Sequence, residues 1–501
     1  MKRDLYLHNT ASNRKELFQP QENGSVGLYC CGPTVYNYAH IGNLRTYIFE
    51  DVLKRALLMC GYKVRHIVNI TDVGHLVSDA DTGEDKMEKG AEREGKSVWD
   101  IAAFYTAKFM EDIANLNITQ PDAWPKAADH IKQMIDMVQT LEEKGFTYRT
   151  TDGIYFDTYK FPAYCDFAHL DPSSLRAGER VDMGEKRNVT DFALWKFSPK
   201  DAKRQMEWES PWGTGFPGWH IECSAMALAY LPQPIDIHCG GADHIRVHHT
   251  NEIAQSEAAT GKKYVNYWLH GEFLVLDKGK MAKSGGNFVT LQKLKERGTD
   301  PLAYRMFCFS AHYRSPLQFS FENVTASAHG LSNLRKTIAN LDTASGVVDN
   351  SEVQTLLTPF MDALCDDLNM PRAIAAVWEV LRDEKASGAA KRAFIEEADK
   401  VLGLDLFRVD EEQVSEVLEE SEGFKISLLF KGDFTQNLKN ILMEKSVLRK
   451  KSRAARNFAE ADKIRDQFAN AGVVVKDMPD GTTQCVVNDP EKTEKQFMLL
   501  G

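Results

Sequence analysis

Val26-Gly27-Leu28-Tyr29-Cys30-Cys31 is a short apolar run, and His40-Ile41-Gly42-Asn43 follows it after a brief polar stretch. Apolar residues then recur at helical spacing from residue 44 to residue 56, and a second apolar, β-branched run occupies residues 64–70. This strand–helix–strand order is the beginning of a βαβ unit. It predicts an α/β domain with a parallel, doubly wound, Rossmann-like sheet.

The strand pattern returns late in the chain, after a stretch of different character. Residues 235–238 and 273–276 have the composition of strands, and residues 245–258 between them have that of a helix. Residues 126–214 contain many prolines, tyrosines and charges, with a short strand pattern at residues 153–159. We interpret this stretch as an insertion that splits one nucleotide-binding fold into two halves.

The pattern becomes helical from about residue 327. Asn369 and Pro371 mark one helix start, and residues 442–470 are again helical before a β-branched run at 473–475. The expected organisation is a first catalytic half at 1–125, a connective insertion at 126–214, a second catalytic half at 215–275, a loop region at 276–326, a helical bundle at 327–440 and a small α+β unit at 441–501.

The composition is that of a soluble globular protein, with 43% hydrophobic and 27% charged residues in a chain of 501. The sequence contains no apolar run of the roughly 18 residues that a membrane helix needs, and its first residues lack the hydrophobic region of a signal peptide. Nine scattered cysteines argue against a disulfide framework. We therefore expect a cytoplasmic protein without membrane attachment.

The net charge of −11 argues against nucleic-acid binding by global attraction, so any RNA contact requires local basic patches. One such patch runs from Lys445 to Arg456, with six cations beside Glu444. The opposite extreme runs from Asp405 to Glu422, with eight acids and one arginine. We interpret the acidic run as a solvated helix face or linker. For the basic run, RNA contact and a solvated face both stay open.

The helix that begins near His40 is suited to a triphosphate. A helix start carries unpaired N–H donors and partial positive charge, and Gly42 lets a nucleotide approach the backbone. His40 and Asn43 can both donate toward the phosphates, while Lys280 and Lys283 add positive charge from a glycine-rich loop. Fixed donors of this kind stabilise the charge that develops on the phosphate oxygens when pyrophosphate leaves an α-phosphate.

Structural interpretations stay open for the same residues. His40 is compatible with a hydrogen-bonded structural histidine, and the two lysines are compatible with a solvated basic loop. The sequence contains neither a Walker A motif nor a G-x-G-x-x-G motif, so a P-loop and a dinucleotide-binding site lack support.

A second constellation combines two thiols, an imidazole and a carboxylate. His248 and Glu252 lie four residues apart in an expected helix, so they share one face. Cys31 ends a strand, and Cys223 follows the loop that contains Trp219. Such a donor set suits tetrahedral zinc, although its spacing matches no compact zinc-finger rule.

Two of these candidate ligands have a neighbour of the same type. Strand alternation places Cys30 and Cys31 on opposite faces, so only one of them faces the site. His249 competes with His248 in a similar way. A buried cysteine is more often a core residue than a ligand, so a structural role for the thiols stays open.

The nucleotide-binding segments resemble two signatures of class I aminoacyl-tRNA synthetases, usually written HIGH and KMSKS. His40-Ile41-Gly42-Asn43 is similar to the first, and Lys280-Met281-Ala282-Lys283-Ser284 is similar to the second. The chain resembles the cysteinyl-tRNA synthetase family in particular, well over residues 4–400 and more weakly in the C-terminal unit. The motifs that carry this resemblance are Cys31 to Tyr36, Asn69 to Asp72, Arg187 to Lys196, Gly218 to Met226, Asp236 to Gly241, His248 to Ser256, Lys280 to Asn287 and His312 to Pro316.

The resemblance implies a monomeric enzyme that activates L-cysteine with ATP and Mg²⁺ and transfers it to the 3′ end of tRNA-Cys. It implies that residues 276–326 contact the tRNA stem, that residues 327–440 bind tRNA and that residues 441–501 bind the anticodon. It also implies one zinc ion per chain, which holds the substrate thiolate and rejects serine where pocket shape alone discriminates poorly.

The same resemblance assigns residues to each part of the site. The zinc ligands are Cys31, Cys223, His248 and Glu252. The ATP-binding residues are His40, Gly42, Asn43, Lys280, Lys283 and Ser284, of which His40, Asn43, Lys280 and Lys283 are catalytic. The residues of the cysteine pocket are Thr34, Trp219, His238 and Asp243.

The sequence departs from the family pattern at a few positions. Asn43 replaces the second histidine of the first signature, and an amide can donate a hydrogen bond but cannot carry charge. Ala282 replaces the serine of the second signature, and Gly285 follows Ser284. Gln484 stands where a family turn often ends in tryptophan, so the mode of anticodon reading stays open.

Two alternatives to a tRNA synthetase stay open. The first is a ligase of the same ancestry that joins activated cysteine to an amino sugar and needs no anticodon-binding end. The second is a non-catalytic, RNA-binding paralogue. The basic helix and residues 457–490 favour the synthetase over the first alternative. The retention of His40, both lysines and all four zinc candidates argues against the second.

Overall fold

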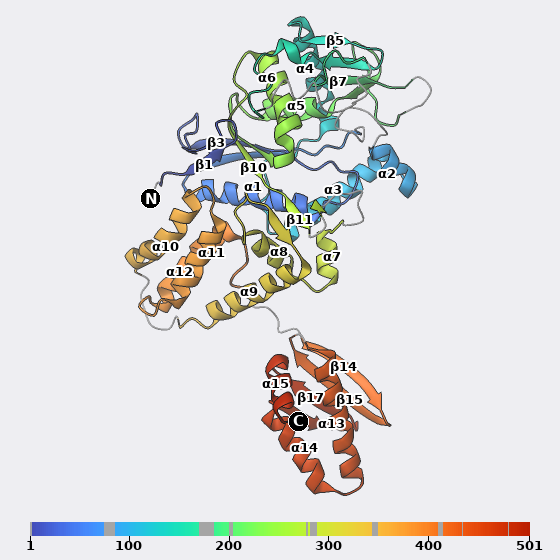
Figure 1. Ribbon diagram of the computed structural model, residues 1–501, viewed down its shortest axis with the longest axis vertical. Coiled ribbons are helices and arrows are strands. Elements are labelled where there is room, and N and C mark those ends of the chain that lie inside the picture. Colours follow the sequence, from blue (N-terminus) through green and yellow to red (C-terminus); the bar gives the residue numbers. More distant parts are fainter. Residues whose placement is uncertain are drawn as a thin grey trace. The chain divides into compact units, whose positions relative to one another are not determined.

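The computed structural model describes residues 3–74, 86–169, 185–199, 204–276, 279–280, 288–342, 349–408, 414–432, 434–478 and 480–500. The chain divides into two compact units, residues 1–407 and 408–501 (Figure 1). Within the described ranges, the helices are too short or too polar to cross a membrane.

A parallel sheet of four strands is the centre of the first unit. Its strands, in the spatial order β10-β9-β3-β4, are β10 (Val265–Gly271), β9 (Ile235–Gly241), β3 (Ser25–Cys30) and β4 (Lys63–Val68). Cys30 belongs to the apolar layer that contains α1 (Ile41–Met59), whereas Tyr29 belongs to the layer that contains α5 (Trp219–Tyr230). Figure 1 shows these helices on opposite sides of the sheet. The predicted parallel, doubly wound α/β fold is confirmed.

The insertion forms an antiparallel sheet together with residues 215–217, which lie just after its expected end at residue 214. Its strands pair in chain order and are β5 (Thr147–Arg149), β6 (Gly153–Phe156), β7 (Phe192–Phe197) and β8 (Gly215–Pro217). Helix α4 (Ile131–Glu143) contacts both α5 and α6 (Thr250–Thr260), and Met134 shares a buried core with Ile221 of α5. The insertion therefore packs on the two helices that follow it in the second half of the fold.

Smaller elements surround the central sheet. They are β1 (Tyr6–Asn9), β2 (Arg14–Leu17), α2 (Lys86–Glu94), α3 (Val98–Asn115), β11 (Leu274–Leu276), β12 (Gly279–Lys280), α7 (Leu291–Glu296), α8 (Pro301–Cys308) and β13 (Leu317–Phe319). β11 pairs in parallel with β13 and antiparallel with β12. Lys280, the first residue of the second signature, thereby has its backbone in a small sheet beside the main one.

A helical bundle completes the first unit. It consists of α9 (Phe321–Ala339), α10 (Asn350–Cys365), α11 (Met370–Arg382) and α12 (Gly388–Leu402). Each helix begins after a polar residue whose side chain accepts a hydrogen bond from a backbone N–H of the first turn, which is the usual N-cap arrangement. Asn369 is the cap of α11 and Pro371 lies in its first turn, as the sequence predicts.

A buried ion pair joins the nucleotide-binding fold to the bundle. Nη2 of Arg305 lies 2.6 Å from Oδ2 of Asp51, and neither side chain is exposed. The same guanidinium donates to the carbonyl oxygens of Leu402 and Leu116, at 2.6 and 3.1 Å. A Cβ at residue 403 would lie 2.9 Å from Nη2, so Gly403 leaves room for the guanidinium. These contacts hold α1, α8 and the end of α12 together.

The second unit is a small α+β fold. Its sheet has the order β14-β15-β17-β16, formed by β14 (Val414–Ser421), β15 (Phe424–Lys431), β17 (Thr483–Val487) and β16 (Val473–Asp477). Its helices are α13 (Gln436–Ala454), α14 (Phe458–Asn470) and α15 (Pro490–Leu500). Leu428 and Phe430 of β15 are buried in one core with Leu442 of α13 and Phe468 of α14.

Two expectations about this region differ from the structure. The acidic run to Glu422 is not a helix face, because its second half forms the edge strand β14, which pairs antiparallel with β15. The compact unit also begins at residue 408 rather than near 441. The reason is that β15 pairs in parallel with β17, so the hairpin belongs to the C-terminal sheet and not to the helical bundle.

The basic run from Lys445 to Arg456 lies in and just after α13, and most of its charge is satisfied locally. Arg449 is buried and forms two hydrogen bonds to the carboxylate of Asp477, at 3.0 and 2.9 Å. Arg453 also pairs with Asp477, and Lys451 pairs with Glu422. The run is therefore in large part an internal ion-pair network of the second unit, which reduces the charge that it can offer to RNA.

Candidate active site and metal centre

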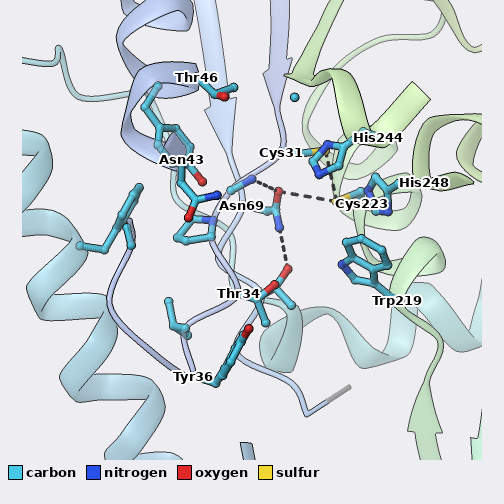
Figure 2. A pocket seen from close by; sticks show the side chains of 18 of the residues that line it. Cys31, Thr34, Tyr36, Asn43, Thr46, Asn69, Trp219, Cys223, His244 and His248 are labelled. Atoms are coloured by element: carbon cyan, nitrogen blue, oxygen red, sulfur yellow. Dashed lines mark hydrogen bonds between the residues drawn. The ribbon is translucent and has the colours of Figure 1, made fainter. Parts of the chain in front are cut away.

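A cavity of about 180 Å³ opens at the carboxyl end of β3. Ligands of open α/β sheets bind in this position, outside the carboxyl ends of the strands. Asn43 at the beginning of α1 lines one part of the cavity, and Trp219 and Cys223 of α5 line another. Figure 2 shows Cys31 and His248 beside Cys223, with Thr34 and Tyr36 lower in the same pocket. One cavity therefore brings together residues of the first signature and of the predicted metal site.

Three of the four predicted metal ligands, Cys31, His248 and Glu252, belong to one compact group of donor atoms, and Cys223 lies next to Cys31. The Sγ atoms of Cys31 and Cys223 are 4.0 Å apart, and Nε2 of His248 is 3.6 Å from Oε2 of Glu252. His249 joins them, because its Nε2 lies 3.4 Å from Sγ of Cys31 and 3.7 Å from Oε2 of Glu252. The donor atoms of Cys31, His248, His249 and Glu252 all lie within 4.8 Å of one another, whereas Cys223 is not part of this compact group.

Local backbone geometry explains which cysteine faces this cluster. Cys30 is the last residue of β3 and points into the layer that contains α1. Cys31 follows it and points to the opposite side, where it packs in one cluster with Cys223. The alternation that the sequence predicts is therefore the one observed.

The histidines depend on a departure from α-helical geometry. Residues 245–249 form a π-helical turn, and α6 begins only at Thr250. A π-turn widens the helix by about one residue per turn and often occurs at functional sites. The sequence predicted a continuous helix over 245–258 and treated His248 and His249 as alternatives. In the structure both rings lie beside Glu252.

A layer of hydrogen bonds surrounds the donor atoms. Oδ1 of Asn69 accepts from the backbone N–H of Gly32 at 2.8 Å and from the thiol of Cys223 at 3.6 Å. Asn69 and Gly32 approach so closely that a Cβ on residue 32 would lie 1.5 Å from the carbonyl oxygen of Asn69. Only glycine fits there, and the contact fixes the end of β3 that carries Cys31.

The histidine rings also have partners behind the cluster. Nδ1 of His220 lies 3.1 Å from Nδ1 of His248. Nδ1 of His249 lies 2.7 Å from Nε2 of His270, whose Nδ1 lies 2.7 Å from Oγ1 of Thr10. Partners of this kind fix the orientation and tautomer of metal-binding histidines. His220 and Asn69 lie within the quoted motifs but were not predicted as site residues, and His249 was predicted only as an alternative to His248.

Burial controls protonation in the cluster. It raises the pKa of the Cys31 thiol well above its usual value. The hydrogen bond with Cys31 lowers the pKa of Cys223, but burial and nearby carboxylates raise it above the usual value overall. Burial, and then the neighbouring histidines, lower the pKa of His249 well below its usual value. A neutral imidazole is the form that ligates metals, and a divalent cation favours thiolates over thiols.

These residues fit a zinc ion. Two thiols, imidazole nitrogens and one carboxylate are the donors that zinc takes in proteins. Glu252 is fully buried, and among the described residues its Oε2 atom has no hydrogen-bond donor in good geometry. A buried carboxylate oxygen without a donor is costly unless a cation pairs with it. The site is therefore compatible with zinc.

The beginning of α1 is a capping box. Nδ1 of His40 accepts from the backbone N–H of Asn43 at 3.0 Å, and Oδ1 of Asn43 accepts from the backbone N–H of His40 at 3.3 Å. Because Nδ1 accepts, the neutral His40 ring carries its proton on Nε2. A Cβ on Gly42 would lie 3.0 Å from Nδ1 of His40, so glycine also leaves room for this ring.

The predicted cysteine-pocket residues divide into two groups. Thr34, Trp219 and Asp243 line the cavity, and the Trp219 ring lies 4.6 Å from the His248 ring. His238 does not line it. This residue is fully buried behind the cluster, with its Nε2 3.2 Å from Oε2 of Glu252. Its position is that of a residue that supports Glu252 rather than one that contacts a ligand in the cavity.

The second signature lies mostly outside the described residues. The backbone of Lys280 is in β12, whereas Lys283 and Ser284 are not described. The far end of the segment returns to α1, because the backbone N–H of Ile41 donates to the carbonyl of Val289 at 2.9 Å. The ring of Phe288 lies 6.0 Å from that of His40. The chain on the C-terminal side of this segment is therefore anchored at the beginning of α1.

Comparisons with known proteins agree with this geometry. Residues 17–329 match the family model described as tRNA synthetases class I (C) catalytic domain. Cysteine–tRNA ligase 1 of Burkholderia lata is 49% identical over 479 residues, which cover 95% of this chain and 96% of that protein. Cysteine–tRNA ligase of Treponema denticola is 42% identical and covers 96% of this chain and 99% of its own length.

A solved structure has the same fold at low sequence identity. Methionyl-tRNA synthetase of Mycobacterium tuberculosis in complex with methionyl-adenylate superposes with a TM-score of 0.52 at 16% identity, covering 76% of this chain and 90% of that one. The family match covers more than half of the chain, and the cysteine–tRNA ligases match it over nearly their full length. The chain is a ligase and belongs to the cysteine–tRNA ligase family of class I aminoacyl-tRNA synthetases.

Proposed function

We propose that this enzyme activates L-cysteine with ATP and Mg²⁺ to cysteinyl-adenylate and pyrophosphate, and then transfers cysteine to the 3′ end of tRNA-Cys. The observation that carries the proposal is the shared cavity. Its walls include Asn43 of the first signature and also Cys31, Cys223 and His248 of the cluster. This arrangement supports the proposal, because adenylate formation requires the site of phosphate chemistry to be adjacent to the site of side-chain recognition.

In the first step, a carboxylate oxygen of cysteine attacks the α-phosphate. A carboxylate–phosphorus bond forms while the bond to the bridging oxygen of pyrophosphate breaks. Nε2–H of His40 and the Nδ2 amide of Asn43 are the side-chain donors that do not take part in the capping box. We assign to them, with Lys280, Lys283 and Ser284, the stabilisation of charge on the phosphate oxygens.

Cys31, Cys223, His248 and Glu252 would hold one zinc ion, with His249 beside them. When bound, zinc supplies a Lewis acid for which a thiolate is a strong ligand and a neutral alcohol a weak one. Selection of cysteine over serine therefore does not depend on pocket shape alone, which separates near-isosteres poorly. Asn69 and His220 orient Cys223 and His248 through the hydrogen bonds described above.

The remaining polar groups of the cavity suit the backbone of an amino acid. We assign Asp243 to the ammonium group and Thr34 to a hydrogen bond with the substrate, with Trp219 closing the pocket against His248. His238 acts through Glu252 rather than on the substrate.

The test is pyrophosphate exchange combined with metal analysis. The wild-type protein should contain one zinc per chain and exchange pyrophosphate with cysteine but not with serine. Cys223→Ala should lose both the metal and the exchange, whereas Cys30→Ala should retain both. His248→Ala should lose metal and His249→Ala should retain most of it. Full zinc retention in Cys223→Ala would exclude the proposed ligand set.

Two other candidate functions predict different results. A ligase that joins cysteine to an amino sugar would exchange pyrophosphate but fail to charge tRNA-Cys. A non-catalytic RNA-binding protein would show no exchange. The match of the cysteine–tRNA ligases extends through the second unit, which supports a tRNA substrate. We propose that the enzyme acts as a monomer in the cytoplasm.

A further inference from the structure

Two reduced cysteines lie in contact at a place that the proposed function does not use. Cys60 follows the last residue of α1 and caps that helix, and Cys365 is the last residue of α10. Their Sγ atoms are 3.8 Å apart, although the residues are separated by most of the first unit. Neither residue lines the cavity of the candidate active site.

The two thiols differ in their access to small solutes. Cys365 lines a surface cavity of about 450 Å³, whose other walls are Arg3, Asp4, Tyr6, Asp362 and Asp366. Cys60 does not line this cavity, and both residues are buried, with Cys60 3% exposed and Cys365 6% exposed. A small solute that enters the cavity therefore meets Cys365 first.

The pKa values of the two thiols also favour Cys365 as the more reactive one. The hydrogen bond from Cys60, and then the charge of Arg3, lower the pKa of the Cys365 thiol below its usual value, against the effect of burial. The hydrogen bond with Cys365, and then burial, raise the pKa of Cys60. Because the thiolate is the nucleophile, the accessible sulfur is also the more reactive of the two.

We propose that Cys365 and Cys60 form a peroxide-sensitive pair that closes reversibly to a disulfide between the ends of α10 and α1. The Cys365 thiolate attacks one oxygen of a hydroperoxide and breaks the O–O bond, which gives a sulfenic acid and releases hydroxide, or alkoxide from an organic peroxide. The sulfur of Cys60 then attacks the Cys365 sulfur. An S–S bond forms, the S–OH bond breaks, and the thiol proton leaves with the hydroxyl group as water.

This disulfide would connect the helix that carries His40 and Asn43 at its other end to the helical bundle. A second pair, Cys31 and Cys223, has Sγ atoms 4.0 Å apart within the candidate metal site. The experiment must therefore separate the two pairs, and metal-loaded protein protects the second pair from oxidation because its thiolates are ligated.

The experiment uses the full-length, zinc-loaded and fully reduced enzyme. It is treated with one to a few equivalents of hydrogen peroxide, blocked with N-ethylmaleimide, and mapped by mass spectrometry after digestion. We expect two of the nine thiols to be lost, with the tryptic peptide of residues 56–63 joined to the peptide that contains Cys365 and released by dithiothreitol. In Cys60→Ser, Cys365 should instead be trapped by dimedone as a sulfenic acid.

A matched control is Cys308→Ser, which removes a buried thiol that lies elsewhere in the same unit and should leave the cross-link unchanged. Recovery of Cys60 and Cys365 as alkylated thiols while other cysteines oxidise would overturn the proposal. A disulfide that forms preferentially between either cysteine and a different cysteine would also overturn the proposal. Because the mapping is done on the wild-type chain, the conclusion does not depend on the folding of any variant.

Discussion

The side chains of His40 and Asn43 each accept a hydrogen bond from the backbone N–H of the other residue. Nδ1 of His40 accepts from the N–H of Asn43, and Oδ1 of Asn43 accepts from the N–H of His40. The capping function of both side chains therefore uses one atom of each. The other polar atom of each side chain is the one that can act on a ligand. Structure and chemistry can thus be separated by substitution.

Asn43→Asp should retain stability and lose activity. The aspartate keeps an oxygen for the N–H of His40, but it replaces the Nδ2 donor by a negative charge beside the triphosphate site. We expect the free energy of unfolding to change by less than about 1 kcal/mol, because the cap is kept. The kcat of pyrophosphate exchange should fall by about 10²-fold or more, as it does in other enzymes when one electrostatic donor to the transition state is removed.

The control for this substitution is Asn43→Ala, which removes both polar atoms. It should lower kcat and also destabilise the protein by about 0.5–2 kcal/mol. If the aspartate variant exchanged pyrophosphate at the wild-type rate, Asn43 would have only a structural role.

Lys280 and Lys283 should act on the transition state more than on bound ATP. Each alanine variant should lower the kcat of exchange by about 10²-fold or more, with a smaller change in the KM for ATP. The measurement is initial-rate exchange at varied ATP, with cysteine in excess. Lys293→Ala is a suitable control, because this lysine lies in α7 and donates to the backbone of Phe288 outside the signature. An increased KM with an unchanged kcat would assign these lysines to ground-state binding.

Arg305→Met should strongly destabilise the first unit, since it leaves the carboxylate of Asp51 buried without its closest partner. Breaking a buried pair in this way costs about 3–5 kcal/mol. All eight tryptophans precede residue 408, so tryptophan fluorescence during urea unfolding reports on this unit alone. Arg55→Met removes a more exposed partner of the same carboxylate, so it should lower the free energy of unfolding by less.

The same ion pair should make stability depend on pH. Burial raises the pKa of Asp51, but Arg305, Arg55 and hydrogen bonds from Thr119 lower it below its usual value overall. A depressed pKa in the folded state gives stability that is present above about pH 4 and is lost as pH falls through the folded value. The difference in the free energy of unfolding between wild type and Arg305→Met should therefore become smaller below about pH 4. An equal difference at pH 7 and pH 3.5 would contradict this assignment.

A chain that ends at Phe407 should still exchange pyrophosphate with cysteine and should charge tRNA-Cys with a raised KM for tRNA. The truncation removes the second unit as a whole, whereas a cut near residue 440 would leave the β14–β15 hairpin without β17. Retention of full charging by the truncated chain would show that the second unit does not bind RNA.

Charge reversal within the second unit should distinguish RNA contact from folding. Arg449→Glu should destabilise the unit, because Arg449 is buried against Asp477. Arg456→Glu and Lys463→Glu change exposed cations and should leave the fold intact. If they contact tRNA phosphates, binding should weaken and its salt dependence should flatten.

The sequence predicted the central sheet because strands buried on both faces have continuous apolar runs, as in residues 26–31 and 64–70. It did not predict β14. Val414–Ser421 contains three glutamates, and among the described strands it pairs with β15 alone, at the edge of the sheet. Charged edge strands carry a weak local signal, because their pairing depends on a partner strand rather than on burial of both faces.

The metal cluster was predictable in part. Strand alternation gives the direction of Cys31, and a spacing of four residues brings His248 toward Glu252. The approach of His249 was not predictable, because a π-turn has no simple sequence pattern. Local sequence does not predict where separate helices and strands meet. The positions of Asn69, His220 and His238 depend on such meetings, so they were not predictable. His238 was assigned to the substrate pocket because its motif matched, but burial places it behind Glu252.

The π-helical turn at residues 245–249 makes the number of residues in this segment as important as their identity. A π-turn corresponds to an α-helix with one inserted residue, so deletion of a single residue from it would restore an ordinary helix. The chain upstream would then be rotated by about 100° relative to Glu252, and no point substitution could return both histidines to the cluster. Deletion scanning, rather than alanine scanning, is thus the mutagenesis to which this centre should be most sensitive. Length variants of this helical turn would be poor starting points for engineering the specificity of the site.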